Sequence, residues 1–494
     1  MDTKALRQKI LDLAIRGKLV PQDPNDEPAS VLLERIRAEK QQMVKDGKLK
    51  PKDIKNDTVI FKDDDNLHYE KFSDGIVKCI EDEIPFDVPN NWEWVRIKTA
   101  CVINPRNSID DNTEVSFVPM ANIKEGYANK FISDIRVWKK VKKGYTHFAN
   151  NDIGIAKITP CFENKKSVVF SSLINGYGAG TTELYILRTI SSLVIPEYLL
   201  NFVKRDDFIA GGVLTFSGDV GQQRVTKDYV ANYLFTLPPL NEQQRILNAV
   251  HTATSLIESI EKANDNLIRD IDKTKAKILD LAIRGKLVPQ DSNDEPASVL
   301  LERIRAEKEE LIKQGKIKHD KKESVIFKGD DNSYYEKYGE KLPSGWVVTN
   351  FETLLSYEQP TNYIVKDTNY NSDYETPVLT AGKSFILGYT DEKENVFSKL
   401  PVIIFDDFTT ESKFVDFPFK VKSSAMKILH INTDIVLPKF AFYLMQATEI
   451  DHDNHQRYWI STYSQEEIAL PPLKEQERIL SVLEQYFKLL NCLL

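Results

Sequence analysis

The sequence predicts two mixed α/β domains joined by a long antiparallel pair of helices. Three observations lead to this fold class: a 32-residue segment that occurs twice, a shorter repeated motif, and a heptad pattern of apolar residues that follows it. Segments 9–40 and 277–308 differ at one position, where Pro24 of the first copy is replaced by Ser292. Copies so similar and so far apart indicate two structurally equivalent units rather than a solenoid of short repeats.

The second repeat predicts where each long helix begins. "LPPLNEQQRIL" at 237–247 returns as "LPPLKEQERIL" at 470–480. The proline pair ends an extended segment, and the acidic residues that follow favour the positive end of a new helix. After the first copy, apolar residues recur in steps of four and three over five heptads, which is the period of a coiled coil. We therefore predict a helix from about residue 242 to residue 284.

The second helix of the pair is predicted to be divided between the two ends of the chain. The heptad pattern resumes after the second proline motif and continues in register near the N-terminus. The sequence thus has a circularly permuted repeat organisation, in which the chain ends fall inside one of the two helices. A pseudo-two-fold axis would relate the two helices. Asn264 interrupts the seam, and it either makes the seam locally wet or fixes the register of the partner helix. The predicted seam residues are Ile246, Val250, Ile257, Ile260, Asn264, Leu267, Ile271, Ile278, Leu281, Ile479, Leu483, Leu490, Leu6, Ile10 and Leu13.

Two non-identical α/β domains are expected between these helices. They open alike, with "VPNNWEWVRI" and "LPSGWVVTNF", and both contain short β-like runs followed by a helical stretch. The expected organisation, in chain order, is an N-terminal helical region (1–40) that completes the distal spacer helix, a connecting arm (41–89), a first α/β domain (90–240), a central spacer helix with a following helical segment (241–310), a second arm (311–341), a second α/β domain (342–472) and a C-terminal helix (473–494).

The composition excludes several classes of protein. Hydrophobic residues make up 41% and charged residues 28% of the 494, which is ordinary for a globular protein of two to four domains. We expect no membrane span, because no apolar run is long enough, and no signal peptide, because the N-terminus is charged. The four cysteines are scattered without paired spacing, so we expect reduced thiols and a cytoplasmic location.

Several motifs carry a resemblance to a known family. Besides the repeats, the first α/β domain contains "DIGIAKITPCFENKK" (152–166), "GTTELYILR" (180–188) and "SGDVGQQRV" (217–225), and the second contains "PVLTAGKSFILGYT" (377–390) and "PVIIFDDFTTESKFVDFPFKVKSSAMKIL" (401–429). With these motifs, nearly the whole chain resembles the DNA-specificity subunit of a type I restriction-modification system. The resemblance implies two target-recognition domains that each read one half of a bipartite double-stranded DNA site, with the helix pair setting the unread gap.

The same resemblance implies a set of partners. Two DNA-methyltransferase subunits would dock on the helices and flip target adenines out of the duplex, and ATP-dependent restriction subunits that translocate DNA would join that core. We expect no cofactor in this chain, since S-adenosylmethionine, ATP and Mg would belong to the partner subunits. Two alternatives remain open: the specificity subunit of a type II-like bipartite enzyme, and an autonomous DNA methyltransferase.

Candidate DNA-binding residues were chosen by charge and by hydrogen-bonding capacity. Contacts to phosphates need Lys or Arg, whereas base readout favours Arg, Asn and Gln. The first α/β domain (91–236) has 18 Lys+Arg against 14 Asp+Glu, and the second (341–469) has 11 against 18, so the second must cluster its positive charge. The "GQQR" motif has a second interpretation, since it could orient a loop instead. The candidates are Lys139, Lys140, Lys142, Lys143, Lys165, Lys166, Gln222, Gln223, Arg224, Lys413, Lys420, Lys422, Lys427, Asn454, Gln456, Arg457 and Tyr458.

Catalytic motifs are missing the contexts that they require. "TAGKS" at 380–384 lacks the first glycine of a phosphate-binding loop, because Pro377 stands at that position. The tetrad typical of amino-methyltransferases does not occur, and "DDFTTESK" has the wrong spacing for a nuclease site. "DHDNH" (451–455) could ligate a metal, yet no other region supplies further ligands. We therefore predict a recognition subunit rather than an enzyme.

Overall fold

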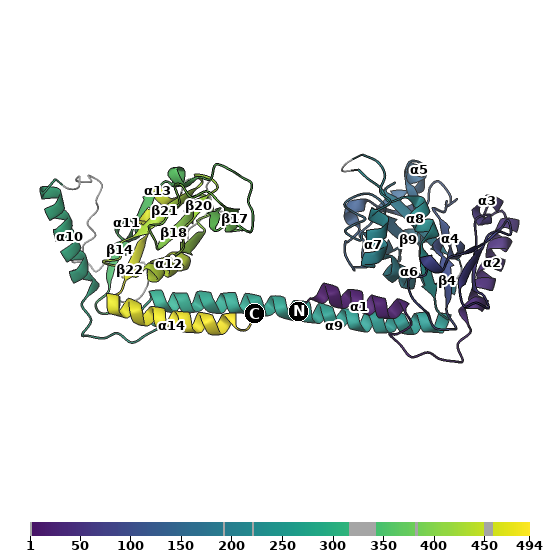
Figure 1. Cartoon of the computed structure of the whole chain (residues 1–494), viewed down its shortest axis with the longest axis horizontal. Helices are drawn as coiled ribbons and strands as arrows, with labels where there is room; N and C mark the ends of the chain where they lie inside the picture. The colour runs from purple at the N-terminus through teal and green to yellow at the C-terminus, as the bar shows by residue number, and fades with distance from the viewer. Residues whose placement is uncertain (1, 191–192, 220–221, 316–341, 381–383, 449–457) are drawn as a thin grey trace. The chain divides into compact units, whose positions relative to one another are not determined.

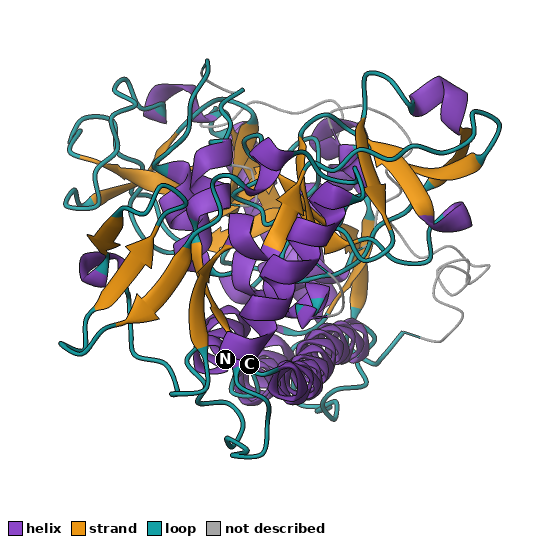
Figure 2. Ribbon diagram, turned by 90° about the vertical axis from the view of Figure 1, so that its right-hand side faces the viewer, coloured by secondary structure: helices purple, strands orange, loops and turns teal. Residues whose placement is uncertain are grey.

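The computed structural model describes residues 2–190, 193–219, 222–315, 342–380, 384–448 and 458–494. The chain divides into two compact units, Met1–Ala263 and Asn264–Leu494. One continuous helix, α9 (Leu240–Ile283), contributes its first half to unit 1 and its second half to unit 2. It begins and ends close to the predicted bounds. The predicted mixed α/β class is confirmed, because each unit combines helices with small sheets. Figure 2 distinguishes the helices from the strands by colour.

Unit 1 opens with helices and an arm that carries a small sheet of its own. The arm strands β1, β2 and β3 pair antiparallel in chain order. The elements are α1 (Thr3–Ile15), α2 (Ala29–Lys45), α3 (Pro51–Ile54), β1 (Val59–Lys62), β2 (His68–Lys71), β3 (Val77–Cys79) and η1 (Glu81–Glu83).

The α/β domain of unit 1, called domain 1 below, contains two four-stranded sheets and one two-stranded sheet. The strand orders are β10-β9-β12-β5, β7-β6-β11-β8 and β13-β4, and the pairing of β6 with β11 is parallel. The elements are β4 (Glu93–Arg96), α4 (Ile97–Ala100), β5 (Cys101–Ile103), β6 (Glu114–Val118), η2 (Met120–Asn122), β7 (Asp134–Val137), α5 (Trp138–Val141), β8 (Thr146–Ala149), β9 (Ile153–Ala156), β10 (Ser167–Val169), η3 (Ile174–Gly176), β11 (Tyr177–Gly180), β12 (Leu184–Thr189), α6 (Pro196–Val203), α7 (Asp206–Val213), α8 (Lys227–Asn232) and β13 (Leu234–Leu237).

The α/β domain of unit 2, called domain 2 below, repeats most of this topology, but its second sheet has three strands where that of domain 1 has four. Its sheets have the orders β19-β18-β21-β15, β17-β16-β20 and β14-β22, and the pairing of β16 with β20 is again parallel. The elements of unit 2 after α9 are α10 (Ala297–Lys313), β14 (Val347–Asn350), α11 (Phe351–Leu354), β15 (Leu355–Glu358), η6 (Pro360–Tyr363), β16 (Thr376–Leu379), β17 (Ile386–Thr390), β18 (Val402–Asp406), β19 (Ser412–Val415), β20 (Lys420–Val421), β21 (Met426–Ile431), α12 (Pro438–Ala447), α13 (Tyr458–Ser461), η7 (Tyr463–Gln465), β22 (Glu467–Leu470) and α14 (Leu473–Asn491).

The duplicated segment makes a set of contacts in unit 1 that fixes domain 1 to the start of α9. Trp92 Nε1, at the entrance of domain 1, donates a hydrogen bond to the buried carboxylate of Glu242 at 2.9 Å, and Gln22 Nε2 donates to the same group at 2.6 Å. Burial raises the pKa of Glu242, although these two donors oppose the shift. Arg245 forms an ion pair of 2.6 Å with the buried Asp26.

Unit 2 repeats these contacts with the second copy of the segment. Trp346 Nε1 donates to Glu475 at 3.0 Å, and Gln290 Nε2 donates to it at 3.2 Å. Arg478 pairs with the buried Asp294 at 2.6 Å. Each copy of the duplicated segment therefore contributes a glutamine and an aspartate that bind the helix following a proline motif. These polar contacts attach the segment to the start of that helix.

A glycine in each copy allows a close approach that any side chain would prevent. Gly17 has φ +65°, and a Cβ at this position would lie 2.4 Å from Pro89 Cγ. Gly285 has the same φ, and its Cβ would lie 2.5 Å from Pro343 Cγ. The left-handed conformation and the proline contact both favour glycine here.

In each unit a terminal helix lies antiparallel to half of α9 (Figure 1). In unit 1, Arg7 near the start of α1 pairs with Glu261 at 2.9 Å, whereas Gln22, just beyond α1, reaches Glu242 near the start of α9. In unit 2, Lys275 donates to Asn491 at the end of α14, and the segment after α9 reaches Glu475 near the start of α14.

The predicted seam is buried at its outer ends and exposed in its middle. The most buried members are Ile246, Val250, Ile257, Ile271, Ile479 and Leu483. Ile10, Leu13, Ile278, Leu281 and Leu490 are half-buried. The prediction was wrong for Leu6, Ile260 and Leu267, which are 37–44% exposed, and Asn264 is exposed as well. On α1 the buried face consists of Leu11, Ala14 and Ile15 instead, because this helix packs into the core of domain 1 as well as along α9.

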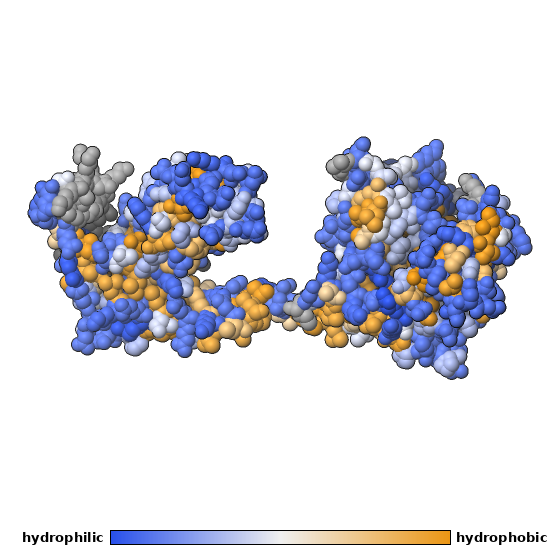
Figure 3. All heavy atoms as spheres, viewed as in Figure 1, coloured by the Kyte–Doolittle hydropathy of each residue, from blue (hydrophilic) through white to orange (hydrophobic). Residues whose placement is uncertain are grey.

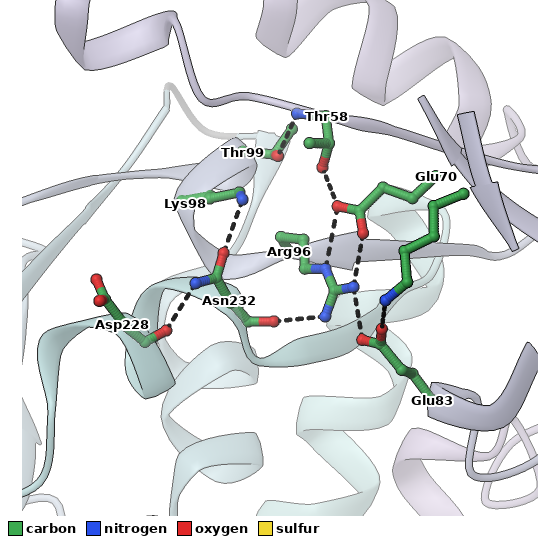
Figure 4. Close-up of polar contacts among 9 residues, drawn as sticks. Thr58, Glu70, Glu83, Arg96, Lys98, Thr99, Asp228 and Asn232 are labelled. Carbon is green, nitrogen blue, oxygen red and sulfur yellow. Dashed lines mark hydrogen bonds and ion pairs between the residues drawn. The ribbon is translucent and has the colours of Figure 1, made fainter. Parts of the chain in front are cut away.

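Arg96 at the end of β4 ties the arm sheet to domain 1 (Figure 4). Its guanidinium donates to Glu70 on β2 and to Glu83 in η1, with 2.7 Å contacts to each, and to the carbonyl oxygen of Asn232 at 2.7 Å. Thr58 Oγ1 donates to the same Glu70 carboxylate. Burial opposes ionisation of Glu70, but the hydrogen bond from Arg96 prevails and lowers the pKa of Glu70. The arm is therefore part of unit 1 rather than a loose linker.

Candidate nucleic-acid interface

Three of the motifs that carried the family resemblance meet at one end of the sheet β10-β9-β12-β5. The segment after β9 runs beside the "GQQR" segment, since Thr159 N donates to the Gln223 carbonyl oxygen and Val225 N donates to that of Lys157, both at 2.9 Å. Lys157 N donates to the carbonyl oxygen of Glu183, which precedes β12. Residues far apart in sequence thus build one continuous surface of domain 1.

Arg224 belongs to the internal structure of this surface. Its guanidinium forms a bidentate pair with Glu183, at 2.8 and 3.0 Å, and donates to the Gln222 carbonyl oxygen at 2.9 Å. The hydrogen bonds from Arg224 lower the pKa of Glu183, so the pair is charged. Of the two interpretations of "GQQR", the geometry favours the one in which the arginine orients the loop. The Gln222 side chain is exposed and that of Gln223 is half-buried.

Beside the three motifs lies a polar cleft of about 290 Å³ that the sequence did not reveal. Its lining includes Arg106, Tyr145, His147, Lys157 and Thr182. Arg106 donates to the Tyr145 carbonyl oxygen at 3.2 Å, and the Lys157 ammonium lies 5.4 Å from the ring centroid of Tyr185. Lys157 stands inside a quoted motif, so a signal for it existed, whereas Arg106 is brought to the cleft only by the tertiary fold.

His147 forms an uncharged wall of this cleft. Its Nδ1 accepts from Asn107 N at 3.3 Å, and its Nε2 lies 3.0 Å from the Lys142 carbonyl oxygen. The ring packs on Trp138 with centroids 4.5 Å apart. Burial, assisted by the nearby charge of Arg106, lowers the pKa of His147, so the ring is neutral at physiological pH.

The predicted lysine cluster of domain 1 lies on α5 and the turn that follows it. Lys139, Lys140 and Lys143 are exposed, and Lys142 pairs with Asp111 at 2.7 Å. Lys166 is half-buried. These positions suit contacts to an external anion, which remains a prediction for each of them.

Lys165 requires a correction, because it is buried and engaged within unit 1. Its ammonium pairs with Asp206 and donates to Tyr127 Oη at 3.0 Å. Tyr127 also accepts from Gln8 of α1. Lys165 therefore helps to hold α1 against domain 1, and its charge is not presented at the surface.

In domain 2 the predicted cluster separates into exposed and buried lysines. Lys413 and Lys422 are exposed. Lys420 is 1% exposed and pairs with Glu392 at 2.9 Å, and Lys427 is 1% exposed and pairs with Asp407 at 3.2 Å. The prediction of surface contacts was wrong for these two residues, because each ammonium group is buried and pairs with a carboxylate of domain 2.

The remaining candidates of domain 2 belong to one short segment. Tyr458 is buried, so the prediction of a DNA contact was wrong for its side chain. Its backbone N donates to the Asp407 carbonyl oxygen. Asn454, Gln456 and Arg457 lie outside the described residues.

The described residues contain neither a cluster of metal ligands nor a membrane-spanning helix. In the part of the chain that the structure describes, no three His, Cys, Asp or Glu side chains gather in a way that could hold a metal ion. Within the same residues, no helix has both the length and the apolar character needed to cross a bilayer.

Comparison with known proteins identifies the family. The family model of the type I restriction modification DNA specificity domain matches residues 89–269 and 343–493, and the chain belongs to this family. The chain is 40% identical over 396 residues to the type I restriction enzyme EcoAI specificity subunit of Escherichia coli, an alignment covering 72% of this chain and 62% of that protein. It is 40% identical over 385 residues to the EcoEI specificity subunit of the same species, covering 69% and 60%. The chain thus spans slightly less than two thirds of the length of these relatives.

A solved structure shares the fold. A chain from a structural study of complex assembly and conformational transition of the type I R-M system superposes with a TM-score of 0.53 at 17% identity, over 83% of this chain and 93% of that one. At this identity the likeness concerns the fold alone.

Proposed function

We propose that this chain is the DNA-specificity subunit of a type I restriction-modification complex, in which domain 1 and domain 2 each read one half of a bipartite duplex site. The observation that carries the proposal is a duplicated frame with two different surfaces. Both domains have the same strand order in the four-stranded sheets β10-β9-β12-β5 and β19-β18-β21-β15 and the same Trp–Glu and Arg–Asp attachments, yet the residues at the ends of the central strands of these sheets differ in charge. Two reading heads on a rigid frame give two half-sites at a fixed spacing.

The proposal includes the helix pair and its circular organisation. α1 and α14 would form the two parts of a helix that runs antiparallel to α9, and the seam would be a coiled coil related to itself by a pseudo-two-fold axis. The antiparallel contacts of α1 and α14 with the two halves of α9 support this organisation. In this arrangement the helices carry no chemistry and act as a ruler between the domains.

The complex would place its catalysis on partner subunits. Two methyltransferase subunits would bring S-adenosylmethionine, and restriction subunits would bring ATP and Mg, so that this chain acts in the cytoplasm as a non-catalytic subunit. Exposed apolar residues on the helices support docking of a partner there (Figure 3). They are Leu6, Leu256 and Ile260 in unit 1, and Leu267, Ile268, Tyr486 and Leu489 in unit 2.

DNA binding by the isolated chain tests whether partner subunits contribute to the affinity of the complex. Domain 2 carries more acidic than basic residues, so partner subunits would have to supply much of the positive surface along the DNA. We expect weak DNA binding by the chain alone, with affinity and specificity appearing when methyltransferase subunits are added. Tight sequence-specific binding by the chain alone, in a gel-shift series at physiological salt, would contradict the proposal.

A further inference from the structure

The polar cleft of domain 1 contains two cations without a partner anion. Neither Arg106 nor Lys157 forms an ion pair with any residue that the structure describes, whereas most buried lysines of the molecule are paired. The cleft lining contains no carboxylate: besides the two cations it consists of Asn104, Pro105, Gly144, Tyr145, Thr146, His147, Thr182 and Leu184. The cleft therefore carries a positive charge, which comes from two side chains, and its other lining residues are uncharged.

The neighbouring groups do not cancel this charge. The Glu183 carboxylate already accepts two hydrogen bonds from Arg224, and the uncharged His147 ring adds neither sign. Lys157 attracts the Glu183 carboxylate electrostatically and helps Arg224 to lower its pKa, so one carboxylate offsets part of the charge of two cations. Arg106 adds a further positive charge, and no carboxylate stands in the cleft lining. An anion from outside the chain would offset the remaining positive charge.

The size and the cation types favour a phosphate over a base. The volume of about 290 Å³ lies at the lower limit of small-molecule pockets, which usually measure ~300–1,000 Å³. Lys157 is a point charge held over the Tyr185 ring, and a lysine binds phosphate without bidentate geometry. Arg106 uses one N–H on the Tyr145 carbonyl oxygen, which fixes the guanidinium at the rim and leaves its other donors for a ligand.

The position of domain 2 that corresponds to Lys157 carries an acidic residue. Ala156 pairs with Leu184 in domain 1, and Asp406 pairs with Met426 in domain 2, so Lys157 corresponds to Asp407. Asp407 is buried and neutralised by Lys427. Among the described residues, the free cation at this sheet end therefore occurs in domain 1, whereas the equivalent position of domain 2 is part of a buried ion pair.

We propose that Arg106 and Lys157 clamp one backbone phosphate of the DNA half-site that domain 1 reads. The inference rests on the proposed function and refines it, since it assigns these two side chains to positioning of the duplex rather than to base readout. Phosphate contacts set register and orientation without carrying sequence information. The three motifs that meet beside the cleft would then present base-reading groups, such as the exposed Gln222, to the adjacent groove.

The test uses the chain in its complex with the methyltransferase subunits. Arg106→Ala, Lys157→Ala and the double variant are compared with Lys71→Ala, which removes an exposed lysine from the arm strand β2. Fluorescence anisotropy gives the Kd for the cognate duplex, and for duplexes altered at single positions of the domain 1 half-site, over a salt series. Conservative variants Arg106→Lys and Lys157→Arg should restore part of the affinity.

We expect each alanine variant of the cleft to weaken binding roughly ten-fold, equally on cognate and altered duplexes, because a charged hydrogen bond is lost without loss of base readout. The slope of log K against log salt should fall by about one for a lost phosphate contact. The Lys71 control should keep both quantities. Unchanged affinity and slope would overturn the proposal, and so would a loss of discrimination at one base pair, which would make the cleft a base-reading site. If the unaltered complex shows no preference for a bipartite site, the proposed function itself fails, and the clamp falls with it.

Discussion

Domains 1 and 2 share the strand order of one four-stranded sheet but have opposite charges at equivalent positions of it. Where Lys157 and Tyr185 stand in domain 1, Asp407 and Lys427 stand in domain 2. In domain 1 the lysine lines an open cleft, whereas in domain 2 the ion pair is buried beneath the surface. The contacts that attach each domain to its helix, by contrast, are the same residue types at nearly the same distances. The comparison separates two groups of residues. Those that attach a domain to its helix are the same in both units, whereas those at the sheet ends differ between the two surfaces.

The largest expected effect comes from Arg96, which attaches the arm sheet to domain 1 in unit 1. Arg96 corresponds in strand register to Asn350, which caps α11 by accepting from Thr353 N. Arg96→Ala leaves the buried Glu70 carboxylate without its cation, and we expect a loss of about 4 kcal/mol in the free energy of unfolding of unit 1. Asn350→Ala removes only a helix cap and should cost about 1 kcal/mol in unit 2. Equal losses in denaturant titrations of the two variants would contradict this account.

The second prediction compares the stability contributions of Lys427, which is buried in domain 2, and Lys157, which lines the cleft of domain 1. Lys427→Met leaves Asp407 buried without its cation, and about 3 kcal/mol of stability should be lost. Lys157→Met should change the unfolding free energy by less than about 0.5 kcal/mol, because Lys157 is half-buried and unpaired among the described residues. Urea melts of both variants measure this difference, and the account is wrong if Lys157→Met proves the more damaging.

A third prediction concerns the parts that should be identical. Gly17→Ala and Gly285→Ala each force a side chain into the left-handed region and against a proline ring, so we expect a loss of about 2 kcal/mol for each. The two losses should agree within about 0.5 kcal/mol, since the contacts are duplicated. Calorimetry of both variants checks this agreement. A large effect in one unit with none in the other would show that the duplicated segments are not structurally equivalent.

The smallest effect is a pH dependence confined to unit 1. Lys204, just after α6, is buried and donates to the carbonyl oxygens of Gly126, Ala128 and Lys165, and burial lowers its pKa to about 7. Because an unfolded lysine stays protonated to about pH 10.5, the unfolded state binds more protons above pH 7, and stability rises with pH. From pH 7 to pH 8 this lysine should add about 1 kcal/mol.

The matched position in domain 2 provides the control for this prediction. Counting from the first proline of α6 and of α12, Lys204 corresponds to the neutral Gln446. Lys204→Met should abolish the rise in the stability of unit 1 between pH 7 and pH 8, whereas Gln446→Met should leave the pH profile unchanged. A profile of the Lys204 variant that still rises by the same amount would refute the assignment.

The sequence predicted the repeated parts of the molecule better than the unique parts. A repeat constrains structure twice, so the helix starts and the equivalence of the two segments could be recognised without coordinates. The seam was misassigned at Leu6 because α1 also packs on domain 1, and heptad spacing says nothing of that second neighbour. Lys165, Lys420 and Lys427 were predicted to be surface cations, since their carboxylate partners Asp206, Glu392 and Asp407 lie on other segments of the chain and leave no local signal. For the same reason Arg106 could not be linked to Lys157 before the fold was known.

The central claim is that two equivalent frames carry two independent readers of DNA. The most direct measurement replaces residues 346–470 with a second copy of residues 92–237, keeping the tryptophan and the proline motif of the frame at each junction, and maps methylated adenines by long-read sequencing in cells that also express the methyltransferase subunits. The account predicts methylation at a target in which the domain 1 half-site occurs twice in inverted orientation. A folded, partner-bound chimera that still methylates the original asymmetric site would contradict it.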